Sequence, residues 1–110
     1  MAIIVETSDP AGLLKAIYEA INDKKVKTWS YDSDGDFTHT PQQWKDQAWL
    51  KPKVYASELR FSILKPEVGE LQTYIYAAYH GRFIEMLLAH FDDSFTAAIG
   101  TAQKTEPDNF

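Results

Sequence analysis

Apolar residues recur every three or four positions between Pro10 and Asp23, which predicts an amphipathic helix. The preceding Ser8-Asp9-Pro10 favours a helix start, because a side-chain oxygen can accept from free amides and proline suits the first helical position. The β-branched run Ala2 to Glu6 predicts either a short strand or an N-terminal apolar staple. The apolar helical positions are Leu13, Leu14, Ile17, Ala20 and Ile21.

Two short aromatic segments flank the sequence Asp32 to Asp36 and predict a β-hairpin. Asp-Ser-Asp-Gly-Asp fits a three-residue loop in which Gly35 adopts a left-handed backbone angle. A two-residue loop at Asp34-Gly35 would divide the aromatic rings between the two faces, so we favour the longer loop. Its register places four rings on one face: Trp29, Tyr31, Phe37 and His39.

The segment after this hairpin predicts a short capped helical turn. Thr40 to Gln43 matches a capping box, in which threonine caps the turn, proline opens it and Gln43 reaches back to the cap amide. The turn would carry Trp44 and Trp49 before Pro52 ends it.

Alternation of apolar and polar residues then predicts a second hairpin. Ser57 to Lys65 and Leu71 to Tyr79 both alternate with a period of two, and Pro66 to Gly69 would join them. His80-Gly81 interrupts this pattern and predicts a strand-to-helix junction.

The C-terminal third predicts a buried helix followed by one short element. Arg82 to Phe91 is apolar on nearly every side, which is typical of a helix inside the core. Phe95 to Ala102 fits a last strand or more helix, and we favour the strand. The expected fold is therefore α+β, with an antiparallel sheet of four to five strands in two hairpins, covered on one face by two helices. Residues 1–102 would form one domain, and residues 103–110 a flexible polar tail.

Composition narrows the function classes. The net charge of −5 argues against nucleic-acid binding, and the absence of cysteine excludes disulfides and cysteine-ligated metals. No apolar window is long enough to span a membrane, and the N-terminus lacks the basic region of a signal peptide. We expect a cytoplasmic protein without a cofactor.

Three aspartates in the hairpin loop invite comparison with the common calcium-binding loop. Counted from Asp32, that loop needs glycine at position six and glutamate at position twelve, where this chain has Phe37 and Gln43. The motif fails. We expect turn chemistry here and no metal site, with Asp32 accepting hydrogen bonds from loop amides. The alternative is weak, adventitious cation binding.

The best ligand-site candidate is His80-Gly81-Arg82. Free amides at a helix start, a glycine that permits close approach and an arginine fork together could hold an anion. His39 could join them in a pocket between the two hairpins and the second helix, as a proton carrier or as a sheet histidine bonded to a neighbouring hydroxyl.

Surplus aromatic residues suggest contact surfaces. Tyr74 and Tyr76 would share the outer face of a strand, and Trp44 and Trp49 would lie on one short turn. Since no complete catalytic constellation is present, we expect a small non-enzymatic binding or accessory domain that forms a homodimer or binds a protein partner. The alternative is an anion-binding protein or hydrolase-like enzyme with its pocket at His80-Gly81-Arg82.

Overall fold

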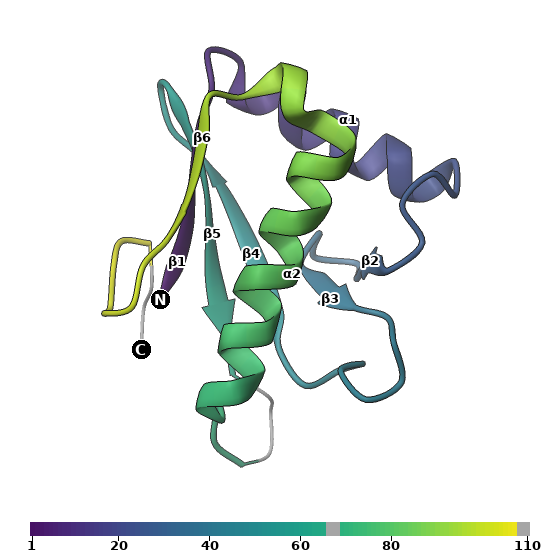
Figure 1. The fold of residues 1–110 in the computed structure, drawn as a ribbon, viewed down its shortest axis with the longest axis vertical. Coiled ribbons are helices and arrows are strands. Elements are labelled where there is room, and N and C mark those ends of the chain that lie inside the picture. Colours follow the sequence, from purple (N-terminus) through teal and green to yellow (C-terminus); the bar gives the residue numbers. More distant parts are fainter. Residues whose placement is uncertain (66–68, 108–110) are drawn as a thin grey trace.

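The structure is a computed structural model that describes residues 1–65 and 69–107. Its described residues form one six-stranded antiparallel sheet and two α-helices (Figure 1). The order along the chain is β1 (Ala2–Glu6), α1 (Pro10–Asn22), β2 (Trp29–Tyr31), β3 (Phe37–His39), β4 (Trp49–Val54), β5 (Glu58–Leu64), α2 (Thr73–Phe91), a 3₁₀ turn (Asp92–Ser94) and β6 (Ala97–Gly100).

The strand order is β2-β3-β4-β5-β1-β6. Helix α1 connects β1 to β4 with β5 lying between them, and α2 connects β5 to β6 with β1 lying between them. These two split βαβ units give the β-α-β-β-α-β succession of ferredoxin-like domains. The β2–β3 hairpin is an addition between α1 and β4 that extends the sheet beyond β4.

Several predicted elements are confirmed. Helix α1 starts at Pro10, and the Asp9 carboxylate caps it by accepting from the Gly12 amide at 3.0 Å. The first hairpin has the predicted register and three-residue loop, and Gly35 has φ of 83°. The predicted strands near both chain ends and at Ser57 to Lys65 are present as β1, β5 and β6, so the α+β fold is confirmed.

The predicted strand from Leu71 to Tyr79 is wrong, because most of it forms the first half of α2. Ile75 and Tyr79 lie on one face of the helix and continue into the buried Phe83 and Leu87. The predicted pairing of this segment with Ser57 to Lys65 is therefore absent, and β5 forms its hairpin with β4 instead. The loop proposed for the predicted hairpin lies partly outside the described residues, at 66–68. His80 and Gly81 lie inside α2, not at a strand-to-helix junction.

The strand missing from the prediction is β4, which raises the strand count to six. Trp49 opens β4 opposite Leu64 and does not belong to the turn that carries Trp44. Within the described part, β4 pairs with β3 only at Leu50. Beyond that residue one edge of β4 is open, and a proline such as Pro52 is tolerated where its nitrogen faces such an edge.

The predicted capping box is also wrong. The Trp44 and Lys45 amides both donate to the Pro41 carbonyl, so a single turn does form. The Thr40 hydroxyl, however, donates to the Lys27 carbonyl at 2.9 Å and ties the turn to the segment before β2.

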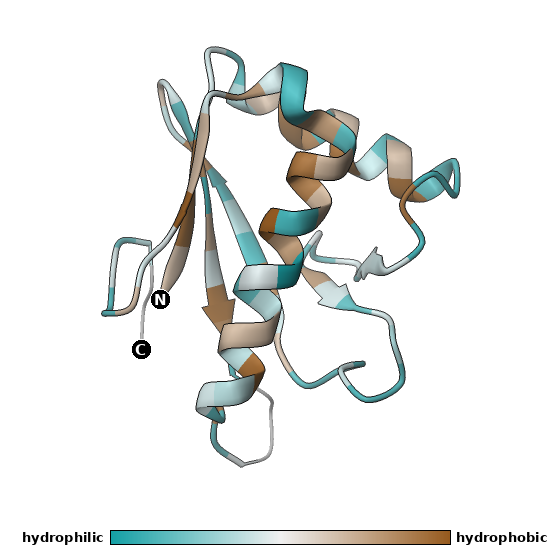
Figure 2. Ribbon diagram, in the orientation of Figure 1, coloured by the Kyte–Doolittle hydropathy of each residue, from teal (hydrophilic) through white to brown (hydrophobic). Residues whose placement is uncertain are grey.

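Both helices pack on the same face of the sheet. Cross-strand pairs align Ile3 with Phe61 and Leu50 with Ile63, and all four are fully buried. In Figure 2, apolar stretches run along β1 and β5 and along the middle of α2. Phe83 is central: its ring lies 4.6 Å from that of Phe61, and it also contacts Trp29 and Phe37.

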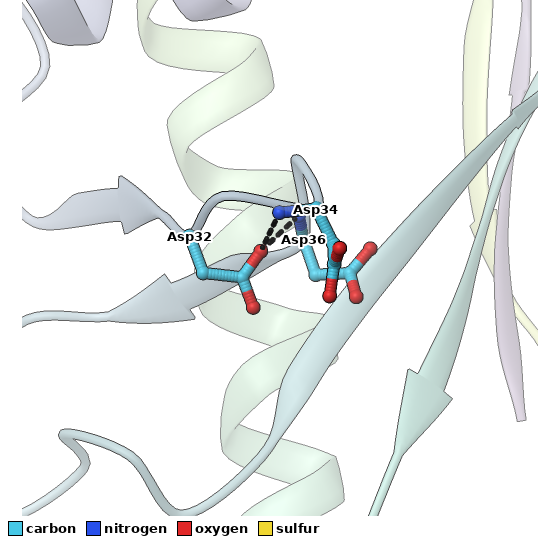
Figure 3. A group of neighbouring side chains, drawn as sticks. All are labelled: Asp32, Asp34 and Asp36. Atoms are coloured by element: carbon cyan, nitrogen blue, oxygen red, sulfur yellow. Dashed lines mark hydrogen bonds between the residues drawn. The ribbon is translucent and has the colours of Figure 1, made fainter.

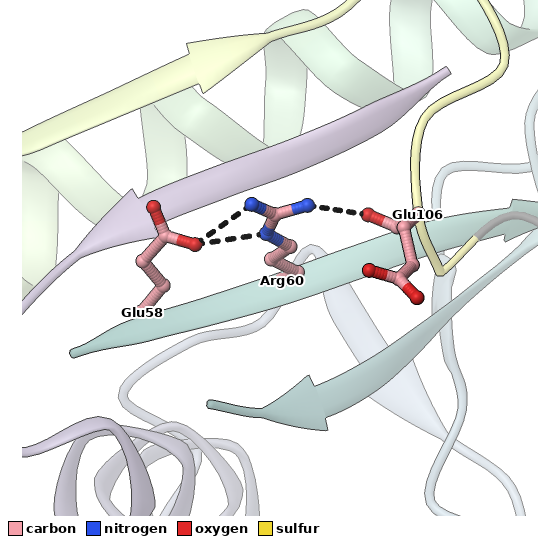
Figure 4. Close-up of polar contacts among 3 residues, drawn as sticks. All are labelled: Glu58, Arg60 and Glu106. Carbon is pink, nitrogen blue, oxygen red and sulfur yellow. Dashed lines mark hydrogen bonds and ion pairs between the residues drawn. The ribbon is translucent and has the colours of Figure 1, made fainter. Parts of the chain in front are cut away.

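Neither of the two helices in the described part of the chain covers the opposite face of the sheet (Figure 1). The Arg60 guanidinium binds the Glu58 carboxylate at 2.9 Å and donates to the Glu106 carbonyl at 2.8 Å (Figure 4). The N-terminal amine also donates to the Gln103 carbonyl. These contacts place part of the segment after β6 against the back of the sheet, while the flexibility expected of 103–110 stays a prediction.

Two glycine substitutions test the fold. We expect Gly81→Ala to raise the free energy of unfolding by about 0.5–1 kcal/mol, since Gly81 is an exposed helical residue with open space at its Cβ position.

We expect Gly35→Ala to lower the free energy of unfolding by about 1–2 kcal/mol or more, because φ is positive and the new Cβ would lie 2.7 Å from the Tyr18 hydroxyl. Urea unfolding measures both, and a destabilising Gly81→Ala would contradict the continuous α2.

Candidate functional site

A pocket of about 360 Å³ lies where the end of β3, the turn after it and the second half of α2 meet. Its size is near the lower end of small-ligand sites. His39 comes from β3, Gln43 from the turn and Arg82 from α2. The other lining residues are Thr28, Pro41, Trp44, Glu85, Met86, Ala89 and His90.

The hydrogen bonding of His39 fixes its tautomer. Its Nδ1 lies 2.7 Å from the Thr28 carbonyl oxygen. Because a carbonyl can only accept, Nδ1 carries the hydrogen, and in the neutral ring the lone pair is on Nε2. No described residue hydrogen-bonds to Nε2. The predicted bond to a neighbouring hydroxyl is therefore wrong, and His39 offers the pocket an acceptor.

Burial keeps this imidazole uncharged. The ring stacks on Trp29 with centroids 4.4 Å apart, and the residue is almost fully buried. Burial lowers the pKa of His39 below its ordinary value, and the Arg82 charge adds to this effect, while the Thr28 hydrogen bond and Glu85 oppose it. At neutral pH the His39 ring therefore carries no charge, and its Nε2 can act as a hydrogen-bond acceptor.

The rim of the pocket is charged. Arg82 and Glu85 lie one helical turn apart on α2, and the guanidinium is 3.5 Å from the carboxylate. Both side chains are more than half exposed, so this ion pair is weak. Either side chain can therefore leave it for another partner. An anionic ligand would compete with Glu85 for Arg82.

A buried polar network holds the turn that carries the pocket wall. The Tyr79 hydroxyl from α2 donates to the Trp44 carbonyl and lies 3.1 Å from the Thr38 hydroxyl. Thr38 in turn donates to the Ala48 carbonyl at 3.0 Å. Trp44 is thus fixed beside the pocket by bonds that do not involve its ring.

The predicted ligand residues are only partly brought together. His39 and Arg82 line the same pocket, but His80 and Gly81 do not. The His80 Nδ1 lies 2.8 Å from the Tyr76 carbonyl, and its ring faces β6, where a Cβ at Gly100 would be 3.9 Å away. Since His80 and Gly81 lie in mid-helix, their amides are engaged in helical hydrogen bonds and cannot form the predicted anion cradle.

The predicted contact residues also separate into two groups. Tyr74 is 64% exposed, and its ring lies 6.3 Å from that of Trp44. Tyr76 is half-buried against His80, because residues two apart on a helix point in different directions. A shared face for Tyr74 and Tyr76 is therefore wrong, and Trp49 lies apart in β4.

Glu85 and His90 are pocket residues that sequence reasoning missed. Their signal is helical spacing, because pocket residues recur every three or four positions on one side of α2: Arg82, Glu85, Met86, Ala89 and His90. These α2 residues lie near His39 only because α2 packs on the β2–β3 hairpin, and the sequence does not show that packing.

The lowered pKa of His39 predicts a pH dependence of stability. The unfolded chain takes up this proton near pH 6.5, whereas the folded protein resists it until lower pH. Folding stability should therefore fall as pH drops below about 6.5 and level off below the folded pKa. We expect His39→Gln to lack this component in urea unfolding between pH 5 and 7.5. His90→Gln is the control, since His90 is exposed, and parallel curves for the wild type and His39→Gln would contradict the assignment.

Comparisons with known proteins add no functional assignment. No family model matches the chain, and no curated protein or solved structure does so either. Neither helix in the described segments is long and apolar enough to cross a membrane. A function has to be argued from the pocket itself.

Proposed function

We propose that the protein binds a small organic anion in the His39 pocket. The observation that supports this most is the pairing of two different groups in one pocket: a guanidinium at the rim and an unprotonated imidazole nitrogen inside it. Arg82 suits a carboxylate or phosphate, because its planar fork can donate two parallel hydrogen bonds. The Nε2 of His39 suits a hydroxyl or N–H on the same ligand.

The remaining lining residues favour a compact, partly apolar ligand. Trp44, Met86 and Pro41 supply apolar surface, and Gln43 can donate or accept. A ligand that carries an acid group and a hydrogen-bond donor a few bonds apart, such as a short hydroxy acid, matches this arrangement.

Binding is favoured over catalysis by the surroundings of His39. A histidine that acts as general base is usually hydrogen-bonded to a nucleophile and oriented by a carboxylate. Among the described residues, His39 has neither partner, and a backbone carbonyl orients its ring. This is the arrangement of a recognition group.

Thermal shift with paired ligands tests the proposal. The probes are lactate and propionate, which differ by one hydroxyl, with phosphate and sulfate at matched ionic strength. We expect lactate to stabilise the wild type more than propionate, and Arg82→Gln to weaken lactate binding by about tenfold, equivalent to about 1.4 kcal/mol. Glu85→Gln should strengthen it, because this change frees Arg82.

The control for net charge is Lys15→Gln, which removes an exposed cation from α1. If Lys15→Gln weakened lactate binding as much as Arg82→Gln, the effect would come from the net charge of the protein and not from a contact in the pocket. A flat response of the wild type to every anion would remove the proposal.

A second candidate is self-association through the aromatic pair Trp44 and Tyr74. Its support is the large exposed ring of Tyr74 beside Trp44, since exposed aromatic residues are enriched where proteins meet. We expect light scattering at high concentration to show a dimer that Tyr74→Ser weakens. Leu88→Ser, at an exposed apolar residue further along α2, should leave it unchanged. A monomer at all concentrations would rule this candidate out.

A further inference from the structure

We propose that the tip of the β2–β3 hairpin binds a calcium-sized divalent cation through Asp32, Asp34 and Asp36. Each of these residues offers a carboxylate oxygen, and the three oxygens lie within 4.8 Å of one another. Figure 3 shows the carboxylates of Asp34 and Asp36 side by side, with that of Asp32 facing them.

The spacing of the oxygens fits a large hard cation. Calcium binds oxygen ligands at about 2.3–2.6 Å, so ligands on opposite sides of the ion lie up to about 5 Å apart. Magnesium binds at about 2.0–2.1 Å and limits that separation to about 4.2 Å. Three oxygens within 4.8 Å of one another can therefore ligate one calcium ion, whose longer bonds and flexible geometry suit an irregular carboxylate cluster better than the near-ideal octahedron of magnesium.

Asp36 is the residue that points to a ligand independently of the cluster. It is only 6% exposed, yet among the described residues its carboxylate has no hydrogen-bond donor and no ion pair. The carboxylate oxygens still reach the surface, so a cation can approach them, and it would compensate a charge that has little contact with water. Turn chemistry explains Asp32 but gives Asp36 no partner.

The local electrostatics agree with this geometry. Burial raises the pKa of Asp36 above its ordinary value, and the nearby Asp32 raises it further. Lys51 of β4 acts in the opposite direction, but from beyond ion-pair distance. The folded hairpin tip thus holds uncompensated negative charge.

Asp32 can serve the turn and the ion together. Its Oδ1 accepts from the amides of Asp34 and Asp36, both at 3.0 Å, as expected from the sequence. Its other oxygen is not used by these bonds and is available to a cation. The Tyr18 hydroxyl donates to the Gly35 carbonyl at 2.6 Å and anchors the loop on α1. The ligands therefore sit on a loop that is already fixed at both ends.

This arrangement differs from the common calcium loop, which is why the sequence spacing does not show it. Three carboxylates come from five consecutive residues, and water would complete a coordination shell of six to eight oxygens. With so few protein ligands we expect weak binding, with a Kd on the order of 10⁻⁴–10⁻³ M, like that of extracellular calcium modules.

Calcium titration of the whole chain tests the proposal. We expect calorimetry to show one site, and NMR to show shifts of the amide signals of residues 32–36. Asp36→Asn should raise the Kd at least tenfold, and without calcium it should melt at a higher temperature than the wild type because charge repulsion is removed. Magnesium should bind at least tenfold more weakly than calcium.

Asp93→Asn is the matched control, because it removes one exposed carboxylate from the 3₁₀ turn after α2. It should leave the Kd unchanged. If Asp36→Asn fails to fold, Asp34→Asn removes an exposed ligand and should also weaken binding. Absence of saturable binding up to about 10 mM calcium, equal affinity for magnesium, or unchanged affinity in the ligand variants would each overturn the proposal.

Discussion

The packing of Phe83 against the sheet is the contact on which the rest of the structure depends. Its ring meets Trp29 on β2, Phe37 on β3 and Phe61 on β5, so one side chain joins α2 to both the central strands and the added hairpin. A hairpin of two three-residue strands is marginal by itself, and within the described part β3 pairs with β4 at a single position. The hairpin is therefore held mainly by its aromatic rings, including the stacking of Tyr18 on Phe37.

The same contact determines what the pocket contains. With Phe83 buried, its neighbour Arg82 must point away from the core, and Glu85 and Ala89 follow on the same side of α2. Trp29, which packs on Phe83, also stacks on His39 and shields it from water. One packing arrangement therefore has two consequences. It buries the His39 imidazole against Trp29, and it leaves the Arg82 guanidinium exposed at the rim of the pocket.

Local signals determined what the sequence could predict. The hairpin register follows from the turn residues and the shared face of the rings, and both act within a few residues. Leu71, Ile75 and Tyr79 misled because a spacing of four fits a strand period of two as well as a helix period of 3.6. Only the continuation into Phe83 and Leu87 distinguishes the helix. The sequence identifies His39 and Arg82 as candidates. It does not show that they share a pocket with Glu85 and His90, because that depends on tertiary contacts. The closeness of the three loop carboxylates likewise depends on the folded loop.

The added segment between α1 and β4 supplies most of the candidate chemistry. The split βαβ framework of β1, β4, β5 and β6 with its two helices contributes most of the core, while residues 23–48 contribute His39, the pocket wall at Trp44 and the three aspartates. Function commonly lies in segments attached to a rigid scaffold, because they can vary without loss of the core. Here the attachment is itself packed: Tyr18 fixes one end of the hairpin and the Tyr79–Thr38 network fixes the other. The candidate groups on it are therefore tied by hydrogen bonds and ring packing to both helices.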